Sequence, residues 1–380
     1  MIGNHISVLT SETVALYTVI DKSMELIDLE DRIRAFSLLG KHVEQLLVTE
    51  RGNTESNKVQ KEISTELLEI CQNAYNQNTW FTKESVIHAF KGLLQYLQEE
   101  NLRKWLANYD LANQSPKIIG TVMAGNIPMV GIHDFISILI SGNKIKVKLS
   151  TLDQFLMKYI AAQLVVAEKR FENYIDFAEL LKGVDALIAT GSDNTARYLE
   201  YYFRKVPRII RKNRTSCAIL RGGETIEDLK NLSKDIFLYF GLGCRNVSKV
   251  FVPENYSFEN LLHALEIDGE KAVQNHKYVN NYDYNKSIFL INKVPHLDNG
   301  YILLKEDDSL FSPISVLHFE YYSNVKELEN QLLQEKDNIQ CIVSKGGYFK
   351  NSIAFGKAQL PQITDYTDGI DTLGFLQKIS

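Results

Sequence analysis

The 380-residue sequence contains few cysteines and carries no strong excess of either charge. Its four cysteines, Cys71, Cys217, Cys244 and Cys341, are widely spaced and form no C-x-x-C pair. This distribution argues against a disulfide framework and against a zinc site, so we expect no metal centre. The net charge of -5 provides no basic footprint, which argues against a nucleic-acid partner.

Long apolar runs and targeting signals are also missing. No segment approaches the roughly 20 apolar residues that span a bilayer, so no membrane span is expected. Residues Met1 to Thr10 lack the basic start and long apolar run of a signal peptide. Hydrophobic residues make up 45% of the chain and charged residues 23%, as in globular proteins with a sizeable core. We therefore expect a cytoplasmic protein, and its length favours two lobes.

Helical spacing of apolar residues dominates the first part of the chain. Leu29, Ile33 and Phe36 begin a repeat that continues to Leu46, with charged residues on the other face. The polar interval Glu50–Lys61 is interpreted as an exposed loop or a helix fringe. We expect residues 1–110 to form a helical region packed on the next lobe, with an acyl-substrate or partner surface as the alternative.

Beyond Lys117, strands and helices alternate. Short buried strands are predicted at 118–123, 144–149, 186–189 and 216–220. Alternation of this kind predicts an α/β fold with a doubly wound parallel sheet, which we assign to a dinucleotide-binding lobe over residues 111–236. However, the chain contains no G-x-G-x-x-G fingerprint, so a dinucleotide would have to bind without those glycines.

A second lobe is expected over residues 237–350, where the alternation is weaker. The apolar residues of 288–292 are read as one of its strands. Residues 351–380 are rich in turn formers and end in a short apolar segment, so they are expected to return to the core as a tail.

Cys244 is the candidate nucleophile. It follows Gly241 and Gly243, which end a predicted helix, and it precedes a predicted strand at 250–252. On position alone a buried apolar cysteine is the commoner case, and a helix C-terminus disfavours a thiolate. A lowered pKa would have to come from backbone N–H groups of the turn, from Arg245 or from a cationic cofactor.

Four short segments follow one another in a set order, and a tail completes the pattern. They are Gly125-Asn126-Ile127-Pro128, Ser141–Lys148, Thr190-Gly191-Ser192, Gly241–Cys244, and the tail segments Phe355–Gln359 and Asp365–Thr372. This order resembles the aldehyde dehydrogenase superfamily and, within it, the acyl-CoA reductase family related to the fatty-acid reductase of bacterial luminescence. The resemblance implies an aldehyde dehydrogenase-like fold of two doubly wound α/β lobes with an N-terminal helical region.

The resemblance also implies roles for individual residues. Cys244 would attack an acyl thioester, and the Asn126 amide would join the Cys244 backbone N–H in holding the oxyanion. Lys148 would bind the adenosine ribose or its 2′-phosphate, and a glycine loop would lie under the pyrophosphate at a helix start. The expected cofactor-binding residues are Lys148, Ser150, Gly191, Ser192, Gly125 and Pro128. His133, on the helix after Asn126, is interpreted as a packed or surface residue, with an approach to the site as the alternative.

Two glutamates of the superfamily are missing from this chain. Residues 211–216 contain no carboxylate where aldehyde-oxidising members carry the one that activates water. Ser309 stands where a second glutamate would contact the nicotinamide ribose. Without a base to hydrolyse a thioester, reduction of an acyl donor is favoured over oxidation of an aldehyde.

We therefore expect an NADPH-dependent acyl-CoA reductase that forms an acyl-Cys244 thioester and releases a fatty aldehyde. Two alternatives stay open: an aldehyde dehydrogenase that oxidises aldehydes, and a non-catalytic acyl-carrier-binding scaffold of the same fold. The choice of NADPH over NADH follows the family resemblance. Acyl-CoA or an acyl carrier as donor, an acyl-transferring protein partner and a homo-oligomer are all compatible with the sequence.

Overall fold

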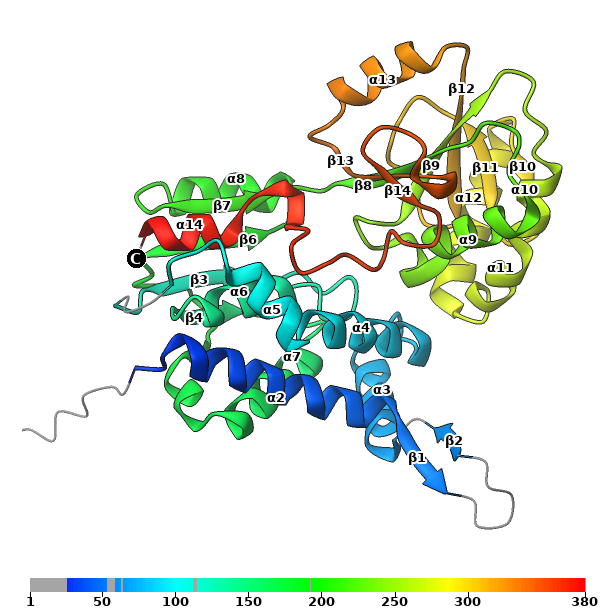
Figure 1. The fold of residues 1–380 in the computed structure, drawn as a ribbon. Helices are drawn as coiled ribbons and strands as arrows, with labels where there is room; N and C mark the ends of the chain where they lie inside the picture. The colour runs from blue at the N-terminus through cyan, green and yellow to red at the C-terminus, as the bar shows by residue number, and fades with distance from the viewer. Residues whose placement is uncertain (1–25, 53–58, 63, 112–114, 192, 380) are drawn as a thin grey trace, which may run out of the picture.

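The computed structural model describes residues 26–52, 59–62, 64–111, 115–191 and 193–379. They form two α/β lobes that lie side by side (Figure 1). The chain leaves the first lobe after β7, builds the second, and returns to the first at its C-terminus. Within the described residues, no helix has the length and hydrophobicity that a membrane span requires.

The N-terminal region is mostly helical. Its helices are α2 (Leu29–Leu47), α3 (Thr65–Gln77), α4 (Lys83–Tyr96) and α5 (Glu99–Leu106). Asp28, Ser64 and Thr82 begin α2, α3 and α4, because each side chain accepts a hydrogen bond from the backbone N–H three residues later. The helix starts are therefore fixed by local capping.

A β-hairpin follows α2. Strands β1 (Thr49–Gly52) and β2 (Val59–Glu62) pair antiparallel and project from the helical region (Figure 1). The expectation of a loop or helix fringe over Glu50–Lys61 is therefore wrong at both ends of the interval, where the backbone forms strands β1 and β2. Polar residues at both ends hid the pairing, because the apolar alternation that signals a strand is absent.

The first lobe contains a five-stranded sheet in the order β5-β4-β3-β6-β7, in which every neighbouring pair is parallel. Its elements are β3 (Ile118–Val122), α6 (Ile132–Ile140), β4 (Lys144–Lys148), α7 (Phe155–Ala167), η1 (Lys169–Asn173), β5 (Ile175–Phe177), β6 (Ala186–Thr190), α8 (Asp193–Tyr202) and β7 (Arg208–Arg211). The strand order reverses beside β3, and parallel strands bring their carboxyl ends to one edge. The loops at that edge are where a ligand of this sheet would bind.

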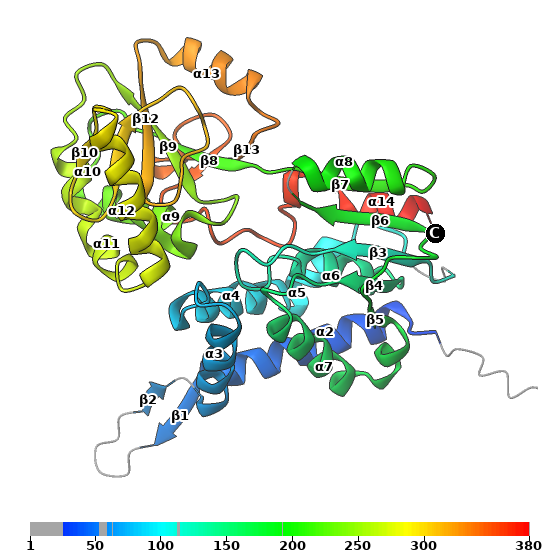
Figure 2. The same cartoon turned by 180° about the vertical axis from the view of Figure 1, so that it is seen from behind.

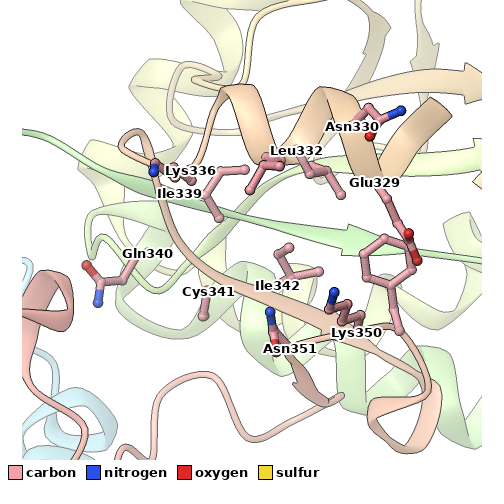
Figure 3. Close-up of a pocket in the computed structure, with 12 residues that line it drawn as sticks. Glu329, Asn330, Leu332, Lys336, Ile339, Gln340, Cys341, Ile342, Lys350 and Asn351 are labelled. Carbon is pink, nitrogen blue, oxygen red and sulfur yellow. The ribbon is translucent and has the colours of Figure 1, made fainter. Parts of the chain in front are cut away.

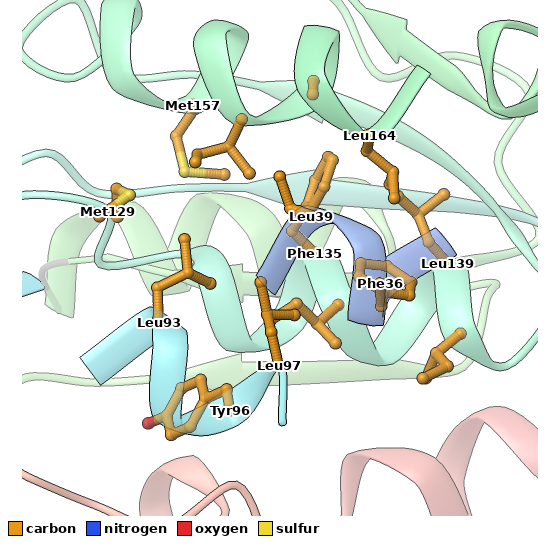
Figure 4. Close-up of a cluster of buried hydrophobic side chains, with 14 of the residues drawn as sticks. Phe36, Leu39, Leu93, Tyr96, Leu97, Met129, Phe135, Leu139, Met157 and Leu164 are labelled. Carbon is orange, nitrogen blue, oxygen red and sulfur yellow. The ribbon is translucent and has the colours of Figure 1, made fainter. Parts of the chain in front are cut away.

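One buried cluster joins the helical region to this sheet. Phe36 and Leu39 of α2, Leu93 of α4, Phe135 of α6 and Leu164 of α7 pack against one another (Figure 4). All five are at most 1% exposed. Their apolar contact fixes the N-terminal helices as a layer on the first lobe.

The second lobe contains a seven-stranded sheet in the order β10-β11-β12-β9-β8-β13-β14, parallel except for β10. Its strands are β8 (Thr215–Ile219), β9 (Val247–Pro253), β10 (Leu297–Asp298), β11 (Leu303–Glu306), β12 (Val316–Tyr322), β13 (Ile339–Ser344) and β14 (Ser352–Ala354). Its helices are α9 (Ile226–Phe237), α10 (Glu259–Ala264), α11 (Glu266–Ala272), α12 (His276–Ile291) and α13 (Val325–Gln334). Leu229 and Leu232 of α9 belong to one buried cluster of this lobe, and Leu328 and Leu332 of α13 belong to another. Figure 2 shows the two helices on opposite sides of the sheet.

The alternation of strands and helices predicted from the sequence is confirmed as an α/β fold, with two corrections. The sheet changes between Arg211 and Thr215, because β8 pairs with β9 and β13, so the expected boundary at residue 236 falls too late. The strand expected at 288–292 is instead the end of α12. A short apolar run does not distinguish a strand from one end of a long helix.

The tail ends on the first lobe. After β14, the chain passes through the short turn η4 (Thr367–Gly369) and forms α14 (Thr372–Ile379). Leu373 and Leu376 of α14 are fully buried in the same cluster as Phe135 of α6. Both ends of the described chain therefore contribute to the first lobe.

Candidate active site

Cys244 lies in a tight turn between α9 and β9, which we call the cysteine turn (residues 241–246). After α9 the chain reverses through Tyr239, Phe240 and Gly241, which all have left-handed backbone angles, with φ of 58°, 57° and 78°. Such angles cost on the order of 1–3 kcal/mol for a bulky residue. Packing of the Phe240 ring on Trp80, with centroids 5.2 Å apart, helps to offset that cost.

The Cys244 thiol is half-buried and is protonated at neutral pH in the cofactor-free protein. Burial raises its pKa to about 11, and the Asp368 carboxylate and the Cys341 thiol add to the raise. The Arg245 guanidinium opposes burial and lowers the Cys244 pKa, as does the backbone N–H of Cys244 itself. Reactivity at neutral pH therefore depends on groups that favour the thiolate.

The loop after β3, which we call the asparagine loop (residues 124–128), reaches across to the cysteine turn. Asn126 Nδ2 donates to the Leu242 carbonyl oxygen at 2.6 Å. A Cβ atom on Gly243 would lie 3.5 Å from Ile127 Cδ1, so the two segments are in van der Waals contact. The structure thus brings together the two predicted catalytic segments. Within the described residues, one of the two N–H groups of the Asn126 amide is used in this hydrogen bond.

Gly125, Lys148 and Ser150 lie together at the carboxyl edge of the first sheet. A Cβ atom on Gly125 would lie 2.7 Å from Ser150 Oγ, so the two loops approach as closely as a glycine allows. Lys148 ends β4, opposite Val122 of β3, and its exposed side chain has no ion-pair partner within the described residues. Pro128 is buried at the end of the asparagine loop.

Gly191 lies at the same edge, after β6. Its N–H donates to the Arg211 carbonyl oxygen at 3.2 Å, and α8 begins two residues later. A Cβ atom on Gly191 would lie 2.8 Å from Thr195 Cγ2, so the strand-to-helix turn is closely packed. Ser192, the other predicted residue here, lies outside the described residues.

Asp153 supports the asparagine loop and escaped the sequence analysis. Its Oδ2 accepts from the Met129 N–H at 2.7 Å, at a residue with φ of 54°. Burial raises the Asp153 pKa to about 7. No local motif marks this aspartate, because its partner is a backbone group 24 residues earlier.

The segment that lacks the water-activating carboxylate carries a buried cation instead. Arg211 ends β7, and its Nη1 lies 2.5 Å from Asp134 Oδ2 while its Nη2 donates to Thr372 Oγ1 at 3.1 Å. The tail contributes the Asp368 carboxylate, which raises the pKa of the Cys244 thiol. Its Oδ1 lies 3.5 Å from Arg214 Nε. Burial raises the Asp368 pKa.

Ser309, which stands in the position of the second glutamate, is bonded within its own loop. Its Oγ donates to the Phe311 carbonyl oxygen at 3.1 Å. His133 is packed, as its position on the helix suggested: it is 6% exposed, and its Nε2 lies 2.8 Å from the Ile363 carbonyl oxygen. Aromatic rings surround its imidazole, namely those of Tyr96, Trp105 and Tyr366.

Two cavities lie near the cysteine turn. One, of about 460 Å³, lies between α4, the Tyr239–Phe240 reversal, α11 and the tail, with His88 and Gln359 in its wall. The second, of about 380 Å³, lies between α13 and β13 (Figure 3). Cys341 lines the second cavity, and its Sγ lies 3.1 Å from Ser216 Oγ, which donates to the Cys244 carbonyl oxygen at 3.0 Å.

Comparisons with known proteins find no match by sequence and clear matches by structure. No family model matches the chain, and no curated protein matches it. An acetylating aldehyde dehydrogenase from Geobacillus thermoglucosidasius superposes with a TM-score of 0.58 at 10% identity, over 89% of this chain and 84% of that one. The chain has the aldehyde dehydrogenase fold.

Further solved structures show the same likeness. A mutant aldehyde dehydrogenase C from Pseudomonas syringae, in complex with NAD+ and octanal, superposes with a TM-score of 0.59 at 11% identity, over 84% of this chain and 72% of that one. A proline utilization A structure gives 0.59 at 12% identity and covers 85% of this chain. This chain spans 37% of the length of that protein. The expected aldehyde dehydrogenase-like fold is therefore confirmed, and the closer likeness to the luminescence reductases stays a prediction.

Proposed function

We propose that the protein is an acyl-CoA reductase that accepts an acyl group on Cys244 and releases it as an aldehyde, with NADPH as hydride donor. One observation carries the proposal: Asn126 of the first lobe contacts the cysteine turn of the second. The family resemblance adds that residues 211–216, which contain no carboxylate, match the segment that activates water in aldehyde-oxidising members. The described residues thus bring an acyl acceptor and a candidate oxyanion donor together, and residues 211–216 offer no carboxylate to activate water.

Acyl transfer needs a nucleophile and a place for the developing negative charge. Cys244 Sγ forms a bond to the acyl carbon, the bond from that carbon to the CoA sulfur breaks, and the proton of the Cys244 thiol leaves with CoA. The Cys244 N–H and the second N–H of the Asn126 amide are the donors available to the oxygen of the intermediate. A donor of this kind is typically worth roughly 3–4 kcal/mol in the transition state.

The Cys244 thioester should resist hydrolysis. An arginine whose charge is paired with Asp134 cannot take a proton from water, because its guanidinium stays protonated. Asp368 contributes negative charge near Cys244, and Arg214 lies 3.5 Å from it. This arrangement favours return of the acyl group to a thiol, or its reduction, over release as an acid.

The carboxyl edge of the first sheet fits a dinucleotide phosphate. Lys148 is exposed and unpaired within the described residues, and residues 149–152 contain no carboxylate that would repel a 2′-phosphate. Gly125 packs closely against Ser150, so the two loops meet at this edge, and α8 begins two residues after Gly191. A helix start favours anions, and we place the pyrophosphate there. Bound there, NADPH would supply the hydride that turns the thioester into an aldehyde.

The 460 Å³ cavity is the proposed place for the acyl chain. It adjoins the cysteine turn through Tyr239 and Phe240, and Phe237, Leu238 and Ala272 add apolar surface. Its volume lies within the roughly 300–1,000 Å³ range of small-molecule sites. Its wall also carries charged residues, so we place an aliphatic chain along the apolar part formed by Phe237, Leu238 and Ala272.

The test is NADPH oxidation with a series of acyl-CoA thioesters, run beside intact-mass detection of the acyl-enzyme. Cys244→Ala should abolish both aldehyde formation and the adduct. Cys71→Ala, which removes a buried thiol in α3, should retain both. An adduct that survives Cys244→Ala, or faster turnover of aldehyde and NADP+ to a free acid than of acyl-CoA to aldehyde, would overturn the proposal.

A further inference from the structure

Asn246 is buried two residues after Cys244, and its hydrogen bonds join the cysteine turn to the end of α9 and to β8. Its Oδ1 accepts from the Gly243 N–H at 2.9 Å, and its own N–H donates to the Gly243 carbonyl oxygen at 3.0 Å. The residue is 1% exposed. Main chain and side chain together therefore close the turn from both sides, with Cys244 and Arg245 as its two central residues.

The amide nitrogen of Asn246 is directed at the end of α9. Nδ2 lies 3.1 Å from the Asp235 oxygen, 3.1 Å from the Ile236 oxygen and 2.5 Å from the Leu238 oxygen, all of them backbone carbonyls. The last carbonyls of a helix have no partner within the helix and carry its negative end. Two amide protons shared among three such oxygens reduce the negative potential at the end of α9, next to the cysteine turn.

We propose that Asn246 is a positioning residue that holds Cys244 at its reactive geometry against the asparagine loop. The inference rests on the proposed function, since the reaction it serves is acylation of Cys244. It adds a residue that touches no reacting atom. Leu242, whose carbonyl receives Asn126, and Gly243, against which Ile127 packs, both belong to the turn that Asn246 closes.

Two substitutions separate the parts of this role. Asn246→Ala removes the acceptor for Gly243 and the donors to α9. Asn246→Asp keeps the shape and the acceptor and places negative charge opposite three carbonyl oxygens. Asn285→Ala is the matched control, because Asn285 is also a buried asparagine of the second lobe whose Nδ2 donates to a backbone carbonyl, that of Ile314, at 3.0 Å.

The experiment measures the single-turnover rate of Cys244 acylation by acyl-CoA and the rate of its alkylation by iodoacetamide, both by intact mass on the full chain. We expect acylation to slow about 100-fold in Asn246→Ala, as for a misplaced reacting group, with NADPH affinity within about twofold of wild type. Asn246→Asp should slow both the acylation and the alkylation of Cys244 at least as much as Asn246→Ala does. Asn285→Ala should leave both within about threefold.

Acylation and alkylation rates in Asn246→Ala that match those of Asn285→Ala would overturn the inference. If Asn246→Ala does not fold, Gly243→Ala tests the same contact, because its Cβ would lie 3.0 Å from Asn246 Oδ1. Slowing of Cys244 alkylation beyond the Asn285→Ala value would support the inference, and an unchanged rate would overturn it. A wild type that alkylates but never acylates would instead refute the proposed function, and the alkylation comparison would still decide the role of Asn246.

Discussion

The reactivity of Cys244 in the cofactor-free protein should rise steeply with pH. Burial raises the thiol pKa to about 11, so roughly one molecule in a thousand carries the thiolate at pH 8. Because only the thiolate reacts, the rate of alkylation should increase about tenfold per pH unit between pH 7 and 10. An unperturbed cysteine, with a pKa near 8.5, would level off by about pH 9.

The assay follows iodoacetamide adducts on the intact protein at each pH, with Cys244→Ala subtracted as background for Cys341 and the two buried cysteines. Arg245→Ala should slow the reaction further, because the guanidinium lowers the Cys244 pKa. Addition of NADP+ should accelerate it at pH 8 if the positive nicotinamide ring binds beside the sulfur. A rate that already levels off below pH 9 in the cofactor-free protein would refute the reasoning.

Three further predictions concern the first lobe. Asn126→Ala should lower the single-turnover acylation rate by about 100-fold or more, since it removes the proposed oxyanion donor and the contact with Leu242; a loss under about fivefold would contradict this. Lys148→Ala should raise the KM for NADPH more than that for NADH, and equal changes would show that this lysine does not bind the 2′-phosphate. Asp153→Asn should flatten the pH dependence of stability in urea unfolding. Burial raises the folded-state pKa of Asp153 to about 7, so the stability present below about pH 4 is lost as pH rises to about 7, by up to about 4 kcal/mol. An unchanged slope between pH 5 and 8 would contradict the assignment.

The loops at the carboxyl edge were predictable because parallel strands impose their own geometry. Strands predicted near residues 118, 144 and 186 alternate with helices, and such strands end at one edge of a sheet. Asn126, Lys148 and Gly191 each follow one of these strands, so their common location followed from the order of elements. Their chemical roles needed the family resemblance as well, since short loops of this kind occur in many folds.

The boundary between the lobes could not be predicted in the same way. A short buried strand such as β8 fits either sheet equally well by composition, and its partners β9 and β13 lie far along the chain. The residues that hold the site in place could not be predicted from the sequence for a related reason. Asp153 and Asn246 bond to backbone groups, which leave no trace in the residue pattern, and Arg211 meets Asp134 across 77 residues.

The packing of α14 on α6 has a consequence for how the protein is made. The second lobe is an insertion within the first: its sheet is complete once β14 has left the ribosome, while the first lobe still lacks its last helix. Domains generally fold from the N-terminus during synthesis, and here that order is inverted for the final step. The eight residues of α14 emerge after every strand of the second sheet, so closure of the first lobe has to wait for them. A nascent chain would therefore display Cys244 on a complete second sheet before α14 has packed on α6 of the first lobe.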